Sequence, residues 1–127
     1  MNKELHDKGL AVRKEVLGAE YVEKSLGAAD DFNRPFQELV TEYCWGAVWT
    51  RDGLTRQSRS ILNLGMLSAL GRSHELKLHI KGALTNGVTR EEVSEILLHA
   101  DVYCCAPAAV DAFRSMREVF AAADAKP

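Results

Sequence analysis

The chain has 127 residues, of which 46% are hydrophobic and 27% charged, a composition that excludes disordered and fibrous classes. Its 16 basic and 18 acidic residues are scattered and give a formal net charge of -2, so we expect no nucleic-acid partner. No apolar run approaches the roughly 18 residues that span a bilayer, and the charged N-terminus lacks the apolar core of a signal peptide. These features predict a cytoplasmic protein with no membrane partner.

Apolar residues recur at helical spacing and hairpin turn sequences are nearly absent, which predicts an all-α fold of about six to seven helices. We expect a single helical domain over residues 1–127, with N-terminal helices in residues 1–27 and the core in residues 32–123. The first helix is expected over residues 3–17 and the second over residues 19–26, because a glycine follows each of them.

A third helix is expected to begin near Pro35, which suits a first-turn position. Its apolar side is expected at Phe36, Leu39, Val40, Tyr43 and Ala47. Thr55 is expected to cap a fourth helix that is apolar or small almost all round, so this helix should be central. The residues concerned are Ile61, Leu62, Leu64, Gly65, Leu67, Ser68 and Leu70.

Ser73 is expected to cap a fifth helix that ends near Gly87. Thr89 and Glu92 have the spacing of a capping box, which predicts the start of a sixth helix. The buried stripe of that helix is expected at Val93, Ile96, Leu97, Ala100 and Cys104. Pro107 is expected to end the sixth helix and to open the last one.

His79 is the most informative residue, because it falls beside Leu76, Ile80 and Ala83 on the apolar face of the fifth helix. A titratable imidazole there costs desolvation free energy unless a partner compensates. It is therefore either a satisfied core histidine or a reactive one. Glu75, one helical turn earlier, could hold the imidazole and would raise its pKa if the two are buried together.

Glu42, Trp45, Trp49 and Arg51 fall close together around the end of the third helix. The two tryptophans are either ordinary core packing or the apolar walls of a pocket. In the second case the charged pair beside them would supply polar contacts for a flat, anionic molecule.

Glu95, His99 and Tyr103 are spaced four residues apart on the sixth helix, so they follow one strip beside its buried stripe. This strip is either a hydrogen-bonded relay or a plain boundary between core and solvent. The spacing alone does not separate these two alternatives.

The three cysteines, Cys44, Cys104 and Cys105, are an odd number with two adjacent, which indicates reduced and mostly buried thiols. Together with His79 and His99 they offer ligand atoms for a metal, but the sequence lacks CxxC, HExxH and any close His/Cys pair. We therefore expect no metal site and no thiol redox chemistry.

The chain resembles the carboxymuconolactone decarboxylase family, within the alkylhydroperoxidase D-like helical fold, in the runs EYCWGAVWTRDGLTRQSRSILNLGMLSALGRSHELKLHIKGALTNGVTREEVSEILLH and DVYCCAPAAVDAFRSMREVF. Peroxidase relatives on this fold place CxxC four residues before a histidine that is followed by an alanine, a glycine and two glutamates. The residues that match are His79, Ala83, Gly87, Glu91 and Glu92. Arg72 and Glu75 fill the two cysteine positions, which favours the decarboxylase branch. Cys105 stands where the decarboxylases usually have a glycine.

The resemblance implies the decarboxylation of 4-carboxymuconolactone, a dianionic lactone, to 3-oxoadipate enol-lactone in the protocatechuate branch of aromatic degradation. The substrate supplies its own electron sink, so no cofactor is expected. We assign His79 as the proton donor, oriented by Glu75 or Glu42, because its ordinary pKa lies near neutrality. His99 is a second catalytic candidate, since it could donate to the developing oxyanion.

Three further residues are assigned to substrate binding. Arg51 would hold a substrate carboxylate, and Trp45 and Trp49 would shape the apolar wall. Tyr103 would share the oxyanion contact with His99.

We also expect self-association, because one small domain of short helices cannot cover a fourth helix that is apolar all round. The resemblance implies a homo-oligomeric ring, with a hexamer as the expected form. Three alternatives stay open: a thiol-dependent peroxidase or disulfide reductase of the same fold, a decarboxylase-like enzyme acting on another lactone, and a non-catalytic helical interaction module.

Overall fold

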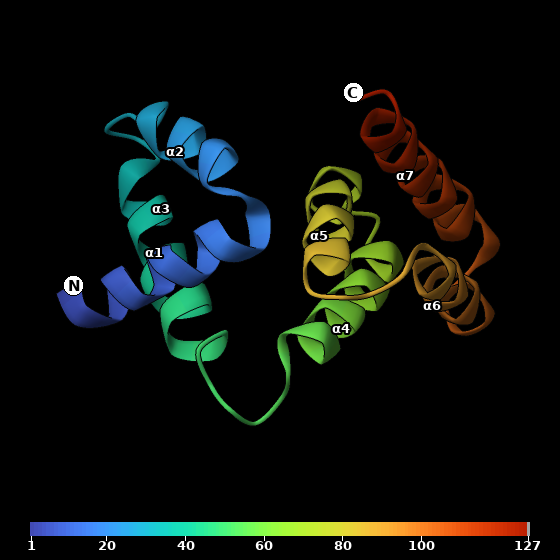
Figure 1. Ribbon diagram of the computed structural model, residues 1–127, viewed down its shortest axis with the longest axis horizontal. Coiled ribbons are helices and arrows are strands. Elements are labelled where there is room, and N and C mark those ends of the chain that lie inside the picture. The colour runs from blue at the N-terminus through green and yellow to red at the C-terminus, as the bar shows by residue number, and fades with distance from the viewer. Residues whose placement is uncertain (127) are drawn as a thin grey trace. The chain divides into compact units, whose positions relative to one another are not determined.

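The computed structural model describes residues 1–126, and every regular element in that part of the chain is a helix (Figure 1), which confirms the all-α prediction. The helices gather into two compact units: unit 1 comprises Met1–Thr55, and unit 2 begins at Arg56. The single domain expected over residues 1–127 stays a prediction. No helix within residues 1–126 is both long and apolar enough to cross a membrane.

Unit 1 contains the four elements α1 (Lys3–Leu17), α2 (Ala19–Gly27), α3 (Arg34–Val40) and the π-helical η1 (Thr41–Val48). The bounds predicted for the first two helices are confirmed to within one residue. Asn2 caps α1, because its side chain accepts a hydrogen bond of 3.0 Å from the Leu5 N–H. Gly18 has φ 92°, a conformation that favours glycine, and so allows the turn between α1 and α2.

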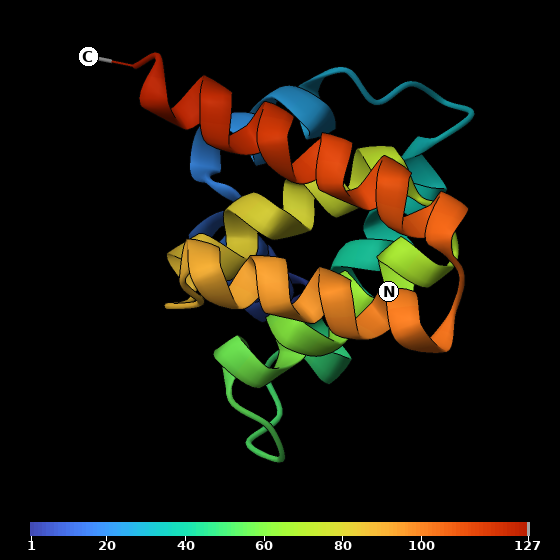
Figure 2. The same ribbon diagram turned by 90° about the vertical axis from the view of Figure 1, so that its right-hand side faces the viewer.

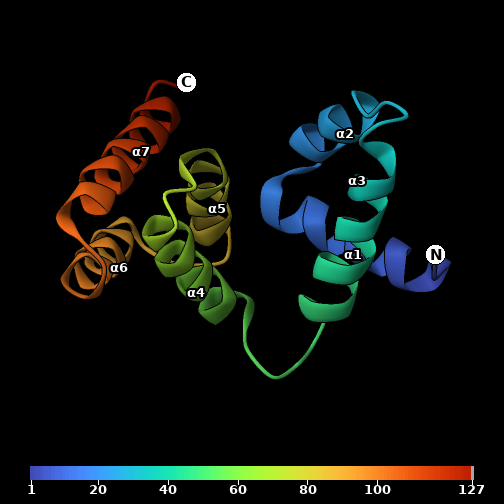
Figure 3. The ribbon, with the colours of Figure 1, turned by 180° about the vertical axis from the view of Figure 1, so that it is seen from behind.

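The third helix begins beside Pro35, as predicted, but its hydrogen bonding changes to the π-helical pattern at Thr41, which the sequence analysis missed. α3 and η1 run on as one column past α1 (Figure 3). Thr41 lies at the junction, where its Oγ1 donates to the Gln37 carbonyl (2.8 Å) and accepts from the buried Arg13 guanidinium (3.0 Å). π-Helical turns are rare and often occur near functional sites.

The core of unit 1 forms where α1 crosses η1. Its buried apolar residues are Val12, Val16, Trp45 and Trp49. Phe36, Leu39 and Tyr43, which we expected on one apolar side, are exposed to solvent instead. α3 buries none of its residues, and η1 packs against α1 through Thr41, Trp45 and Gly46, which leaves the three exposed side chains outside the contact.

Unit 2 contains α4 (Arg56–Ala69), α5 (Ser73–Thr85), α6 (Arg90–Tyr103) and α7 (Ala106–Asp124). Figure 2 faces this unit and shows α6 beside α7. One hydrophobic core joins all four helices; its buried residues are Leu64, Leu76, Ile80, Ala83, Val88, Val93, Leu97, Ala112 and Val119.

The capping box at the start of α6 is confirmed. Thr89 Oγ1 accepts from the Glu92 N–H (3.1 Å), and the Glu92 carboxylate accepts from the Thr89 N–H (2.9 Å). Pro107 lies in the first turn of α7, as predicted. The predicted cap at Ser73 is wrong: Ser73 is the first residue of α5, and its hydroxyl donates to Asp111 of α7 (2.6 Å).

The fourth helix is less buried than its composition suggested. α4 contacts α5, α6 and α7, but only Ser60, Leu64 and Ser68 are buried. Its exposed large apolar residues are Ile61, Leu62 and Met66, and Leu70, directly after the helix, is exposed as well. Small polar residues occupy the face that packs inside unit 2, and this leaves much of the apolar surface of α4 outside the core.

Candidate active site

His79 lies at the edge of the buried face of α5. Leu76, Ile80 and Ala83, spaced three or four residues from one another, are at most 1% exposed and fix this face against the core of unit 2. The same helical spacing places His79 half-buried. The predicted position on an apolar face is therefore confirmed, although the imidazole is not enclosed.

Asn63 of α4 is a polar neighbour of this imidazole. Its Nδ2 lies 3.4 Å from His79 Nδ1, within hydrogen-bonding distance. The sequence analysis missed Asn63, although a signal was present: it is the one side-chain amide in the apolar run of residues 61–70. An amide in such a run usually has a hydrogen-bonding partner in the fold.

The electrostatics of His79 differ from our expectation. Burial lowers the pKa of His79 below its ordinary value, and the charge of Glu75 opposes this with a smaller effect. Glu75 is exposed at the first turn of α5, so water screens its attraction for the imidazolium. The condition for a raised pKa, burial of both groups together, is not met, and burial of the imidazole outweighs the opposing effect of Glu75.

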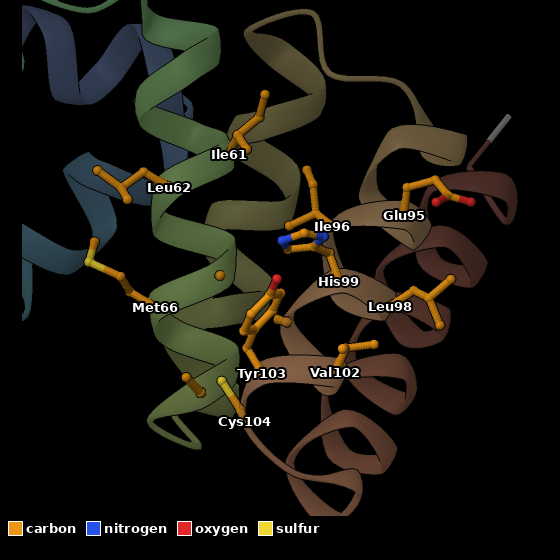
Figure 4. A pocket seen from close by; sticks show the side chains of 13 residues that line it. Ile61, Leu62, Met66, Glu95, Ile96, Leu98, His99, Val102, Tyr103 and Cys104 are labelled. Atoms are coloured by element: carbon orange, nitrogen blue, oxygen red, sulfur yellow. The ribbon is translucent and has the colours of Figure 1, made fainter.

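A groove of about 930 Å³ lies between α4 and α6, where Figure 4 shows the side chains along its walls. The walls are mainly apolar, and His79 is not among the residues that line the groove. His99 and Tyr103 do line it, with ring centroids 5.0 Å apart and ring planes inclined by 38°. The Glu95 side chain extends away from these two rings (Figure 4).

His99, Tyr103 and Glu95 are all exposed, so the boundary interpretation fits this strip better than an internal relay. The structure brings the two rings together, and among the described residues no hydrogen bond links Glu95 to His99. Of the relay that the spacing allowed, the structure shows only the contact between the rings of His99 and Tyr103.

Four of the predicted site residues lie in unit 1, and three of them make contacts that stabilise the unit itself. Trp45 and Trp49 stack with centroids 4.8 Å apart and are 3% and 6% exposed, as core residues are. Glu42 accepts a hydrogen bond from the Asn2 N–H (3.0 Å), which holds the first turn of α1 against η1. Arg51 lies in the turn after η1 and is exposed.

All three cysteines are free, but the expectation of mostly buried thiols is wrong for two of them. Cys104 and Cys105 are exposed, because they lie where α6 ends and the chain turns into α7. Cys44 is half-buried, and burial raises the pKa of its thiol above the ordinary value, while nearby Arg13 lowers it by less.

Comparison with known proteins defines the class. Residues 34–118 match the model of the carboxymuconolactone decarboxylase family. The chain is 41% identical over 119 residues to the 4-carboxymuconolactone decarboxylase of Acinetobacter baylyi, which covers 94% of this chain and 89% of that protein. It is 50% identical over 112 residues to the nitrosuccinic acid decarboxylase of Metarhizium robertsii, covering 88% and 78% of the two chains.

These matches identify an all-helical enzyme of the decarboxylase class. The chain belongs to the carboxymuconolactone decarboxylase family, as its sequence pattern indicated.

Proposed function

We propose that this enzyme decarboxylates 4-carboxymuconolactone to 3-oxoadipate enol-lactone, in the protocatechuate branch of aromatic degradation. The observation that carries the proposal is the 41% identity, over 94% of the chain, to a relative with that name. The half-buried imidazole of His79, at the histidine position of the family pattern, supports it.

The reaction needs a proton donor but no external electron acceptor. When the carboxylate on the ring leaves as carbon dioxide, the electron pair of the broken C–C bond passes through the adjacent C=C to the lactone carbonyl. Negative charge then lies on that oxygen and on the α-carbon. Protonation of the α-carbon gives the product, so the enzyme has to supply an acid near neutral pH.

His79 is the proposed acid. Burial lowers the pKa of its imidazole in the free protein, because it disfavours the charged form. A dianion bound beside the ring raises that pKa, because opposite charge favours the imidazolium. The acid would therefore form where substrate is bound, with the weaker help of Glu75.

Arg51 stays our proposed partner for a substrate carboxylate, and Trp45 and Trp49 stay the proposed apolar wall. Glu42 keeps its proposed role beside the imidazole with less support, since its carboxylate already binds the Asn2 N–H. The proposed oxyanion contacts of His99 and Tyr103 also have weaker support, because His79 does not line the groove that holds them.

Nitrosuccinic acid is a second candidate substrate, favoured by the 50% identity to the relative from Metarhizium robertsii. Its chemistry is closely related. The carboxylate on the carbon that bears the nitro group leaves as carbon dioxide, the electron pair passes to the nitro oxygens, and the carbon is then protonated. The same pairing of a dianion with a proton donor serves both reactions.

The two candidates are separated by measuring kcat/KM for both acids with one enzyme preparation. Our proposal predicts that the lactone is the better substrate by at least about tenfold, which corresponds to about 1.4 kcal/mol of transition-state stabilisation. A tenfold preference for nitrosuccinic acid would support the second candidate instead. Carbon dioxide release from neither acid would contradict both.

A homo-oligomer, with a hexamer as the expected form, is a further part of this proposal. Its support is the apolar surface around the groove between α4 and α6. The exposed members are Ile61, Leu62, Met66, Leu98 and Val102. Contiguous apolar surface of this kind is typical of protein interfaces. We therefore propose that a second copy of the chain packs against it. A mass of only 14.0 kDa in light scattering at micromolar concentration would contradict it.

We place the enzyme in the cytoplasm. The support is the presence of three free cysteines, two of them exposed, which suits a reducing compartment.

A further inference from the structure

We propose that Asn63 is a positioning residue that holds the His79 imidazole with its proton on Nε2. The geometric basis is the 3.4 Å approach of Asn63 Nδ2 to His79 Nδ1, from α4 to α5. An amide nitrogen only donates, so the ring nitrogen that faces it has to accept. The second ring nitrogen of the neutral imidazole then carries the proton.

The partner helix holds Asn63 firmly in place. Asn86, at the end of α5, donates to Ser60 Oγ (2.9 Å), one turn before Asn63 on α4. Gln57 Nε2 donates to the Gly87 carbonyl (3.2 Å). These two contacts and the fully buried Leu64 fix the register of α4 against α5.

The tautomer decides what His79 offers to a ligand. Before substrate binds, the neutral ring with its proton on Nε2 presents a hydrogen-bond donor on the side away from Asn63. When bound dianion favours the imidazolium, Nδ1 also carries a proton, and the Asn63 amide has to rotate so that its oxygen accepts from Nδ1. With its proton on Nδ1 alone, the neutral ring would present an acceptor, which repels a carboxylate or a developing oxyanion. This consequence for catalysis rests on the proposed function, whereas the tautomer itself does not.

The test is ¹⁵N NMR of the histidine side chains in the full-length protein without substrate, near pH 8, above the ordinary pKa of histidine. The chemical shifts of the two ring nitrogens report which of them is protonated. The His79 signals are assigned by their loss in His79→Gln. We expect the wild-type ring to be protonated at Nε2.

Asn63→Asp is the decisive variant, because it is nearly isosteric but its carboxylate only accepts hydrogen bonds. We expect His79 Nδ1 to become protonated in this variant. Gln37→Ala is the matched control, since it removes a side-chain amide that contacts Arg13 in unit 1 and should leave the His79 shifts unchanged. In Asn63→Ala, the chemical shift of His79 Nδ1 should move toward the value of a ring nitrogen that accepts no hydrogen bond from an amide.

A kinetic measurement then tests the catalytic consequence. Asn63→Ala should lower kcat by at least about tenfold, less than the loss of the acid itself, with KM nearly unchanged. A wild-type ring protonated on Nδ1, or His79 shifts in Asn63→Asp equal to those of wild type, would overturn the inference. Since the NMR experiment uses no substrate, its result is independent of which acid the enzyme decarboxylates.

Discussion

Gly9 of α1 and Gly46 of η1 meet backbone to backbone. A Cβ added at Gly9 would lie 2.5 Å from the Gly46 nitrogen and 2.9 Å from its Cα, and it would also strike the Thr41 carbonyl oxygen. No rotamer change relieves a clash with backbone. The crossing of α1 and η1, which carries the tryptophan core of unit 1, therefore depends on the absence of side chains at both positions.

Gly9→Ala is expected to lower the free energy of unfolding by about 1–3 kcal/mol, the usual cost of overpacking a well-packed core. The effect opposes helix propensity, which favours alanine over glycine by up to about 1 kcal/mol. Gly27→Ala is the control, since a Cβ there meets no atom within 4 Å. In urea unfolding, equal midpoints for the two variants would contradict this account of the crossing.

The stability of the fold should depend on pH through His79. Its pKa is lowered in the folded state and is about 6.5 in the unfolded chain. Between these values the unfolded state binds more protons, so the free energy of unfolding falls as the pH drops below about 6.5. His79→Gln should remove this contribution. His74→Gln, on an exposed position of the same helix, should keep the pH dependence of wild type.

Unfolding curves at about pH 7.5 and about pH 5 measure this difference. If wild type and His79→Gln lose the same free energy between the two values, the imidazole is not desolvated in the folded protein.

Arg51→Met should lower kcat/KM for the dianionic substrate roughly 10- to 100-fold. The reason is the loss of a charge-assisted hydrogen bond, which contributes about 1.5–3 kcal/mol. Arg114→Met removes an arginine of similar exposure that pairs with Asp111 (3.8 Å), and it should leave the kinetics unchanged. Unchanged kinetics in Arg51→Met would place this side chain outside the site.

Replacing Cys44, Cys104 and Cys105 with serine distinguishes the decarboxylase from a thiol peroxidase of the same fold. The raised pKa of the Cys44 thiol disfavours the reactive thiolate, and this chain has Arg72 and Glu75 where the peroxidase pattern carries its CxxC pair. We expect the triple variant to keep the decarboxylase activity of wild type. A peroxidase activity in wild type that disappears in this variant would favour the alternative.

The sequence predicted those parts of the fold that local chemistry determines. Thr89 and Glu92 specify their capping box within four residues, and Gly18 specifies the end of α1. The exposure of Leu62 on α4 was not predictable in this way, because it depends on which neighbours pack there. At the start of the π-helical turn Thr41 likewise accepts a hydrogen bond from Arg13, 28 residues away, a contact that no local pattern predicts.

The candidate site was also predictable only where a local sequence pattern determines the position of a residue. His79 was identified from its helical spacing relative to Leu76 and Ile80. Its partner was not, since Asn63 lies 16 residues earlier on another helix, and no local pattern pairs the two. The sequence pointed instead to Glu75, the nearest carboxylate on the same helix, which is exposed.

The most direct measurement of the central claim is carbon dioxide release from 4-carboxymuconolactone by wild type and His79→Gln, with thermal unfolding of both as a check of the fold. Loss of a well-placed proton donor should slow the reaction about 10²- to 10⁴-fold. We predict rapid release by wild type and a loss of this size in the variant. A folded His79→Gln enzyme with activity within tenfold of wild type would contradict the assignment of His79 as the proton donor.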